Sequence, residues 1–263
     1  KGQPESDSCA AKMAGAACGL AVDIGTTTVV MGLYDLDSGE RLAGLQEKNS
    51  QTLLGADVMM RLMHCQRGSQ HTLEQRIREQ IQNMAEQLCD GFCALEQIKT
   101  IAVVGNTTMC HIFLGQDISG LAGSPFRPAY RGIYRCKGSD IDLQEMKDTD
   151  VIVPAGIDAH VGADAVSMIC ALQLQETKET VLAVDIGTNA EIALSCKGEI
   201  SVCSAPAGPA FEGAQISQGM RGEPGAIAGM HIARQSGNIL LEVIPDDRRN
   251  VYPVRGICGS GLI

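Results

Sequence analysis

The segment LAVDIGT occurs twice in this chain, at residues 20–26 and again at residues 182–188. At average residue usage, a chance repeat of this length in a chain of 263 residues has odds on the order of one in several thousand. Each copy is an apolar run that ends in an acid, a glycine and a threonine. The repeat therefore indicates an internal duplication, with two lobes that open with the same element.

Both copies of the segment lie in a strand-turn-strand pattern. After the first copy, TVVMGLYDL continues with β-branched residues, and after the second copy EIALSC runs through a Lys197-Gly198 turn into EISVCS. The chain between the copies predicts a helix with apolar residues three or four apart, a buried strand in KTIAVVG, a capped helix start in NTTM, and a proline-containing loop at about residues 123–138. We therefore expect each lobe to be a mixed β-sheet with helices on its faces.

These patterns predict the division of the chain. Residues 19–180 form the first lobe and residues 181–263 form a partial second lobe. Residues 1–18, KGQPESDSCAAKMAGAAC, are polar and then rich in alanine, which is typical of a linker or tail.

Composition argues against several classes of partner. A net charge of −10, without a basic run and with only 3% aromatic residues, disfavours nucleic acid. The apolar run at residues 14–22 is too short to cross a bilayer, which takes about 20 residues, and it lacks a basic flank, so we expect neither a membrane span nor an export signal. Eleven cysteines without a C-x-x-C pair are typical of a reduced cytoplasm, and we interpret most of them as small buried apolar side chains.

The repeated turn has the chemistry of an oxyanion site. Glycine lets the backbone approach a ligand closely, and the residues after it supply N–H and hydroxyl donors: Gly25, Thr26, Thr27 and Thr28 in the first copy, and Gly187, Thr188 and Asn189 in the second. Asp23 and Asp185 would repel a phosphate at close range, but a hydrated Mg²⁺ between the carboxylates and the phosphates removes that conflict. A single copy would equally fit plain turn chemistry.

Two copies favour nucleotide binding, because two such loops can face one another across a cleft and each hold part of one polyphosphate. The chain has neither a G-x-x-x-x-G-K-[ST] run nor a G-x-G-x-x-G after a strand, so we do not expect the corresponding nucleotide-binding folds. The D-x-G-[TS] loops instead resemble those of the superfamily of sugar kinases, heat-shock chaperone ATPases and actin.

Further stretches narrow the resemblance. SQTLLGADVMMRL, VVGNTTMCHIFLG, HVGADAVSMI, DIGTNAEIAL, SAPAGPAFEGAQISQGMRGEPGAI and GICGSGLI together resemble the ATPase domain of reductive activators of corrinoid proteins. The match runs along most of the chain from Gly19, and the combination of GNTTM, DIGTN-x-E and GPAFEG is its most specific part. The chain departs from the family pattern at Ala190, where the family usually has glycine.

The resemblance implies a fold and an activity. The fold is α/β, with two ribonuclease-H-like (actin-like ATPase) lobes containing mixed sheets, of which the second is expected to be incomplete. The activity is ATP-driven electron transfer that returns the cob(II)amide of a corrinoid methyltransferase protein to cob(I)amide, with ATP and Mg²⁺ as cofactors. The partners implied are the corrinoid protein and an electron donor. The donor acts through a ferredoxin-like [2Fe-2S] domain, which is expected to be missing from the N-terminal side. A homodimer is one alternative for the assembly.

We assign site residues on these grounds. Asp23, Asp185 and Glu191 are the predicted catalytic residues, with Asp23 and Asp185 also facing the metal, and Glu191 is either a residue that orients water or a solvated strand carboxylate. By resemblance, Gly208 and Glu212 in GPAFEG join the nucleotide-binding residues of the two loops, and Asp164 is either a cleft residue or a helix-capping acid. Two other features stay open: the segment 106–108 fits a phosphate contact or a helix cap, and the cluster of Met59, Met60 and Met63 fits a core more readily than a partner surface.

Three other functions remain open from the sequence. A small-molecule kinase of the same fold would need a base near the γ-phosphate. A dehydratase-type activator would carry a [4Fe-4S] cluster between two subunits, which the wide spacing of the cysteines disfavours. A non-catalytic scaffold would not need both Asp23 and Asp185.

Overall fold

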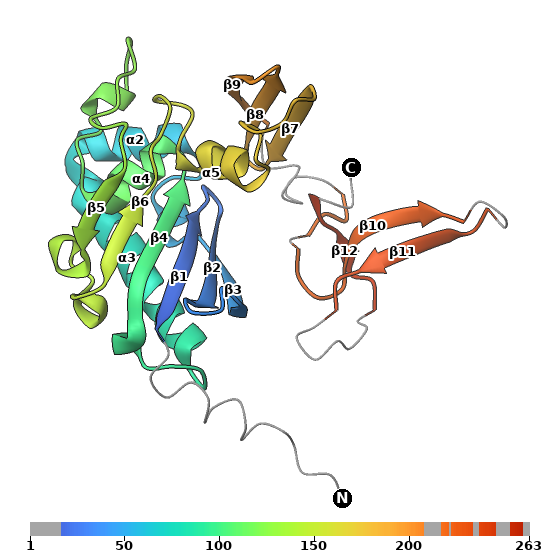
Figure 1. Cartoon of the computed structure of the whole chain (residues 1–263), viewed down its shortest axis with the longest axis horizontal. Helices are drawn as coiled ribbons and strands as arrows, with labels where there is room; N and C mark the ends of the chain where they lie inside the picture. The colour runs from blue at the N-terminus through green and yellow to red at the C-terminus, as the bar shows by residue number, and fades with distance from the viewer. Residues whose placement is uncertain (1–16, 208–216, 221, 234–236, 246–252, 260–263) are drawn as a thin grey trace, which may run out of the picture. The chain divides into compact units, whose positions relative to one another are not determined.

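A computed structural model describes residues 17–207, 217–220, 222–233, 237–245 and 253–259 (Figure 1). The chain divides into two compact units, one made of residues 1–181 and 195–201 and the other of residues 182–194 and 202–263. In the described part of the chain, no helix combines the length and the apolar character needed to cross a membrane.

A six-stranded mixed sheet forms the framework of the first unit. Its strand order is β3-β2-β1-β4-β6-β5, in which β1, β4 and β6 run parallel and β2, β3 and β5 are antiparallel to their neighbours. The strands are β1 (Cys18–Ile24), β2 (Thr28–Asp35), β3 (Arg41–Lys48), β4 (Ile98–Gly105), β5 (Tyr134–Lys137) and β6 (Asp150–Val153). The mixed sheet and the first hairpin predicted from the sequence are confirmed, and β1 starts at Cys18, one residue before the expected start of the fold.

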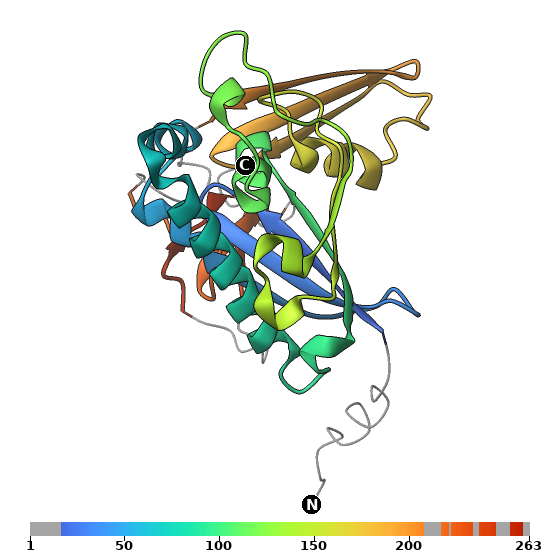
Figure 2. The ribbon, with the colours of Figure 1, turned by 90° about the vertical axis from the view of Figure 1, so that its left-hand side faces the viewer.

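Four helices of the first unit have defined bounds: α2 (Val58–His64), α3 (Gln70–Cys89), α4 (Thr107–Leu114) and α5 (Ala163–Ala171). Figure 2 shows α3 lying across the sheet, and α3 contacts β2, β3 and α4. The residues that predicted this helix from their spacing are all buried in the core: Leu73, Ile77, Ile81, Met84 and Leu88. The helix prediction is therefore confirmed, and its apolar face is what holds it to the sheet.

The strand β1 shows how the repeat positions its acid. Leu20, Val22 and Ile24 point into the core, and the alternate residues Ala21 and Asp23 are exposed on the other face. The apolar side chains at every second position of the first LAVDIGT therefore hold the strand against the core. Because the side chains of a strand alternate between its two faces, the Asp23 carboxylate is accessible on the other face.

Two elements differ from the predictions. The segment 123–138 contains β5 at its end, so its description as a loop is wrong for those residues, where Tyr134 packs against the core. Met59, Met60 and Met63 are exposed on α2, so the interpretation of this cluster as core is wrong. The buried face of α2 is formed instead by Arg61 and Leu62.

Two three-stranded sheets follow along the chain. One has the order β7-β8-β9, from β7 (Val181–Ile186), β8 (Asn189–Cys196) and β9 (Glu199–Pro206), and the other has the order β11-β10-β12, from β10 (Ala226–Ile232), β11 (Ile239–Val243) and β12 (Gly256–Ile257). Lys197 and Gly198 join β8 to β9 with φ values of 53° and 85°, the positive pair that a tight hairpin turn of this kind requires. The second predicted hairpin is thus confirmed.

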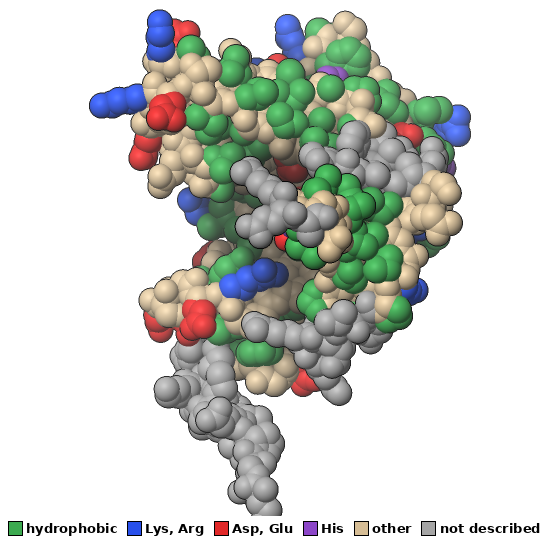
Figure 3. Space-filling view, turned by 90° about the vertical axis from the view of Figure 1, so that its right-hand side faces the viewer, with side chains coloured by type: hydrophobic (Ala, Val, Ile, Leu, Met, Phe, Trp, Pro, Cys, Tyr) green, Lys and Arg blue, Asp and Glu red, His purple; other side chains and the backbone are tan. Residues whose placement is uncertain are grey.

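Apolar side chains of these smaller sheets remain exposed. Leu182, Val184 and Ile186 of β7 are 63%, 44% and 36% exposed, whereas their counterparts in the first copy of the repeat, Leu20, Val22 and Ile24, are at most 2% exposed. The β10–β11 hairpin likewise exposes Met230, Ile232, Ile239, Leu240 and Leu241. Hydrophobic side chains, in green, occupy much of the face shown in Figure 3. The segment LAVDIGT thus buries its aliphatic side chains in the first copy and exposes them in the second.

Candidate functional site

The first repeated turn joins β1 to β2 through residues 25–27. Asp23 lies on the exposed face of the sheet, opposite Val30 of β2 and Val104 of β4. Gly25 follows at a position that only glycine fits, because a Cβ atom there would lie 2.5 Å from the carbonyl oxygen of Thr28. The strand and the tight turn therefore place the carboxylate of Asp23 next to the backbone of the loop.

The loop is held from beneath by three donor side chains. The Asn49 Nδ2 donates to the carbonyl oxygen of Gly25 at 2.8 Å, and the Arg61 guanidinium donates to the carbonyl oxygen of Thr26. The Asn106 Nδ2 donates to the Thr26 hydroxyl at 3.2 Å. Thr26 is accordingly buried, while Thr27 and Thr28 are half-buried.

This arrangement sets the direction of the backbone donors. In a trans peptide unit the C=O and the following N–H point in opposite directions. Because the carbonyls of Gly25 and Thr26 point toward Asn49 and Arg61, the N–H groups of Thr26 and Thr27 point away from these side chains. A turn with its amides directed outward is the geometry that binds oxyanions.

Asn106 has two contacts of different kinds. Its Oδ1 accepts from the backbone N–H of Met109 at 3.0 Å and caps α4, which leaves its Nδ2 for Thr26. The structure therefore supports the cap for this residue and adds a contact to the first loop that the sequence did not predict.

The turn that precedes α4 lies close to two other segments. A Cβ atom at Gly105 would lie 2.8 Å from the carbonyl oxygen of Ile24, and a Cβ atom at Gly162 would lie 2.5 Å from the backbone nitrogen of Thr107. The ends of β1 and β4 and the start of α5 thus pack backbone against backbone, with glycine making each approach feasible.

Asp164 belongs to the same end of the sheet. It lies in the first turn of α5 and its Oδ1 accepts from the N–H of Ala165 at 2.8 Å. Burial raises the pKa of the Cys110 thiol, and the charges of Asp164 and Asp23 raise this pKa further. The close approach of Gly162 to Gly105 and Thr107 places the start of α5, and with it Asp164, at the same end of the sheet as the first loop.

The second repeated turn is organised by backbone contacts. Asp185 is exposed at the end of β7, the N–H of Gly187 donates to the carbonyl oxygen of Asn189 at 2.8 Å, and the N–H of Ala207 donates to the carbonyl oxygen of Thr188 at 3.2 Å. Thr188 is the counterpart of Thr26 in the repeat. The same carbonyl is thus bound in both copies, by a backbone amide in the second and by a guanidinium in the first.

Glu191 is buried in β8, where it is only 7% exposed. Its Oε1 accepts from the Ser204 hydroxyl of β9 at 3.2 Å. The alternative of a solvated strand carboxylate is therefore wrong. Gly208 and Glu212, the other predicted residues of this part of the site, lie outside the described residues.

The structure thus brings the predicted site residues into two groups, each within its own unit. Asp23, Gly25, Thr26, Thr27 and Thr28 form the first, with Asp164 nearby, and Asp185, Gly187, Thr188, Asn189 and Glu191 form the second. Sequence reasoning missed Asn49 and Arg61. No local pattern in SQTLLGADVMMRL distinguishes Arg61, because its buried position depends on contacts with distant residues.

Among the described residues, no group of three or more histidine, cysteine, aspartate or glutamate side chains could hold a metal ion. A magnesium ion that arrives with nucleotide phosphates needs no such group, since one or two carboxylates and water complete its shell. Asp23 and Asp185, each exposed beside a loop, fit this use.

Two family models match the chain in sequence. The model described as RACo middle region matches residues 18–177, and the model described as C-terminal domain of RACo, the ASKHA domain, matches residues 179–263.

Curated relatives match over most of this chain. Corrinoid activation enzyme RamQ from Eubacterium limosum is 34% identical over 249 residues, which is 93% of this chain and 40% of the relative. The [Co(II) methylated amine-specific corrinoid protein] reductase from Methanosarcina barkeri is 30% identical over 250 residues, which is 90% of this chain and 46% of the relative.

A solved structure matches in fold as well as in sequence. The reductive activator for corrinoid, iron-sulfur protein is 34% identical, with a TM-score of 0.83 over 95% of this chain and 39% of that protein. The predicted α/β fold of the actin-like ATPase type is therefore confirmed. The chain spans less than half of the length of each of these three proteins.

Proposed function

The chain belongs to the RACo family of reductive activators of corrinoid proteins, and on that premise we propose that it forms the ATP-binding and ATP-hydrolysing part of such an activator. The activator returns the cob(II)amide of a corrinoid methyltransferase protein to cob(I)amide. This electron transfer is uphill, and the free energy of ATP hydrolysis drives it.

One observation carries the proposal. The chain contains two D-I-G-T turns, each at the end of a strand, and in both the threonine carbonyl is bound from behind, by Arg61 in one and by Ala207 in the other. A turn held in this way directs its next amide away from the holding group. Two preorganised oxyanion sites in one chain suit a polyphosphate better than a single small anion.

The acids beside the turns complete the chemistry. Asp23 and Asp185 would orient the water molecules around a magnesium ion, and Mg²⁺ neutralises charge on the phosphate oxygens when it is bound. The backbone amides of Thr27 and Asn189 would bind phosphate oxygens. The carbonyls of Thr26 and Thr188 are held by Arg61 and Ala207, so the amide in the same peptide unit points in the opposite direction.

Glu191 is our proposed residue for orienting the attacking water. Its burial in β8 removes it from bulk solvent, and the Ser204 hydroxyl fixes one carboxylate oxygen. A buried carboxylate that is held in one position is suited to accept a proton from water.

The remaining proposals concern partners and location. We propose that a corrinoid protein is the substrate of the reaction, since one relative is a corrinoid activation enzyme and the other is a corrinoid protein reductase. We propose that electrons arrive through a ferredoxin-like [2Fe-2S] domain of the intact protein, that the active assembly includes a homodimer, and that the protein works in the cytoplasm, where its many free thiols stay reduced.

A spectroscopic assay tests the proposed function. The intact protein is mixed with its cob(II)amide-bearing partner, a low-potential reductant and ATP·Mg²⁺, and the visible absorption of cob(I)amide is followed in time. We expect cob(I)amide to form with ATP·Mg²⁺, and not with ADP or with the Asp185→Asn variant.

The matched control is Asp150→Asn, which removes an exposed strand carboxylate that pairs with Lys137 at 2.7 Å and lies at the end of the six-stranded sheet opposite the first turn. Its activity should equal that of the wild type. Formation of cob(I)amide at the same rate without nucleotide would contradict the proposal.

A further inference from the structure

Arg61 is a buried arginine that connects the first loop to two other segments. It is 0% exposed, and its guanidinium donates to the carbonyl oxygen of Thr26. Its other donors reach the Gly55 carbonyl at 3.1 Å, the Gln51 Oε1 at 3.2 Å and the Met109 Sδ at 2.8 Å. The side chain therefore joins the loop to the segment before α2 and to α4.

The charge of Arg61 lacks a direct counterion. Over the described part of the chain, none of the ion pairs includes Arg61. Burial lowers the pKa of Arg61 to about 10, and the charge of Asp57 opposes this shift. The guanidinium is nonetheless charged at neutral pH, so a buried positive charge lies directly beneath the loop.

Burying a charge without a counterion costs free energy unless the charge is well hydrogen-bonded. The hydrogen bonds from Arg61 to the carbonyl oxygens of Gly55 and Thr26 offset part of this cost. An anionic ligand on the outer side of Thr26 and Thr27 would stabilise the charged guanidinium, and the guanidinium would stabilise the ligand.

We propose that Arg61 is a positioning residue for phosphate binding. By holding the Thr26 carbonyl it fixes the peptide unit whose other end is the Thr27 amide, and it adds positive potential beneath the triphosphate. This inference rests on the proposed function, because it assigns a role in ATP binding to a side chain that does not itself touch ATP.

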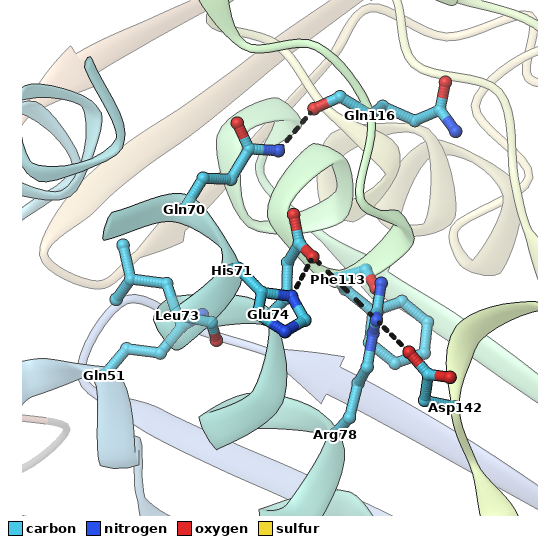
Figure 4. A network of polar contacts seen from close by, with 9 residues as sticks. All are labelled: Gln51, Gln70, His71, Leu73, Glu74, Arg78, Phe113, Gln116 and Asp142. Carbon is cyan, nitrogen blue, oxygen red and sulfur yellow. Dashed lines mark hydrogen bonds and ion pairs between the residues drawn. The ribbon is translucent and has the colours of Figure 1, made fainter. Parts of the chain in front are cut away.

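A second buried arginine provides a matched control. Arg78 of α3 is also buried, its Nε donates to the carbonyl oxygen of Phe113 at 2.9 Å, and its Nη1 lies 3.3 Å from Asp142 (Figure 4). The network around Arg78 contains Glu74, which also contacts His71, and it includes no residue of the first loop. Replacing Arg78 removes a similar buried group without touching residues 25–28.

The experiment measures binding of ATP·Mg²⁺ and of adenosine by calorimetry in the intact protein. For Arg61→Met we expect ATP·Mg²⁺ binding to weaken by about tenfold or more, and adenosine binding to change by less than about twofold. Arg61→Lys, which keeps the charge and a single donor nitrogen, should recover part of the loss. Arg78→Met should leave the ratio of the two affinities unchanged.

A nucleotide-free measurement accompanies the binding data. The backbone amides of residues 25–28 should exchange hydrogen faster in Arg61→Met than in the wild type or in Arg78→Met, since the loop loses a contact that orders it. Should Arg61→Met fail to fold, Arg61→Lys carries both measurements, with a smaller expected change of the same sign.

Four outcomes overturn the inference. Equal weakening of ATP·Mg²⁺ and adenosine, or equal effects of Arg61→Met and Arg78→Met, would make Arg61 a general structural residue. Wild-type affinity for ATP·Mg²⁺ in Arg61→Met would remove its role while leaving the proposed function intact. Absence of ATP·Mg²⁺ binding in the wild type would instead overturn the proposed function, and this role with it.

Discussion

The side-chain amide of Asn106 lies 3.2 Å from the hydroxyl of Thr26 and donates to it. This contact joins the turn after β1 to the first turn of α4, two segments that are far apart in the sequence. Asn106 also caps α4, so one side chain connects the loop to the start of that helix.

Replacing Asn106 should separate its two contacts. Asn106→Ala loses the cap and should lower the free energy of unfolding by about 1 kcal/mol. Asn106→Asp keeps a capping oxygen but loses the donor to Thr26 and adds a negative charge, so we expect near-native stability with weaker ATP binding. Urea denaturation and calorimetric titration measure the two effects, and equal ATP affinity in Asn106→Asp and the wild type would contradict this assignment.

Gly25 should not tolerate a side chain. An alanine Cβ would lie 2.5 Å from the Thr28 carbonyl oxygen, so Gly25→Ala must displace the loop and should cost about 1–3 kcal/mol of stability. Gly123→Ala is the control, because nothing lies within 4 Å of a Cβ atom there. Thermal unfolding of the two variants checks this prediction, which fails if both unfold at the same temperature.

Glu191→Gln should slow ATP hydrolysis without preventing ATP binding. If the carboxylate accepts a proton from water, its loss should reduce kcat by about 10²- to 10⁴-fold, since the amide keeps the shape but not the basicity. A steady-state phosphate-release assay measures the rate, with the exposed Glu199→Gln of β9 as the control. An unchanged rate in Glu191→Gln would show that another group positions the water.

Acid should destabilise the fold through His111. Burial lowers the pKa of this histidine below the ordinary value of 6.5, and its neutral ring donates from Nδ1 to the Thr107 carbonyl at 2.7 Å while Nε2 accepts from the N–H of Ala129 at 3.2 Å. Below pH 6.5 the unfolded chain takes up a proton that the native ring resists, so stability falls as pH falls through that window.

The His111→Phe variant tests this linkage. Phenylalanine keeps an aromatic ring for the stack on Tyr130, whose centroid lies 4.4 Å from that of His111, but it does not titrate. Urea midpoints between about pH 5 and pH 8 should therefore vary less in the variant than in the wild type. Identical slopes in both proteins would rule out His111 as the source.

The parts of the site that could be predicted from the sequence are those with a local cause. The period-two alternation in LAVDI places Asp23 on the exposed face, the glycine that follows marks a close approach, and Asn106 directly before a helical run is a cap. Each of these conclusions depends on residues only a few positions apart.

The residues that were missed depend on distant partners. The Arg61 guanidinium binds Thr26 and Met109, neither of which is near it in the sequence, and a charged residue beside methionines reads as a surface position. The methionines around it are exposed for the complementary reason: α2 turns its charged residue inward to reach the loop. β3 was missed because it is an edge strand whose sequence, RLAGLQEK, lacks a regular alternation of apolar and polar residues.

The exposed aliphatic side chains of β7 have a practical consequence for experiments with this chain. The aliphatic side chains of Leu182, Val184 and Ile186, each more than a third exposed, form an apolar surface on which two molecules of the protein can associate. We therefore expect the purified 263-residue chain to self-associate at high concentration, at temperatures well below its unfolding temperature. Light scattering against concentration would report this, and a Val184→Thr replacement should delay its onset.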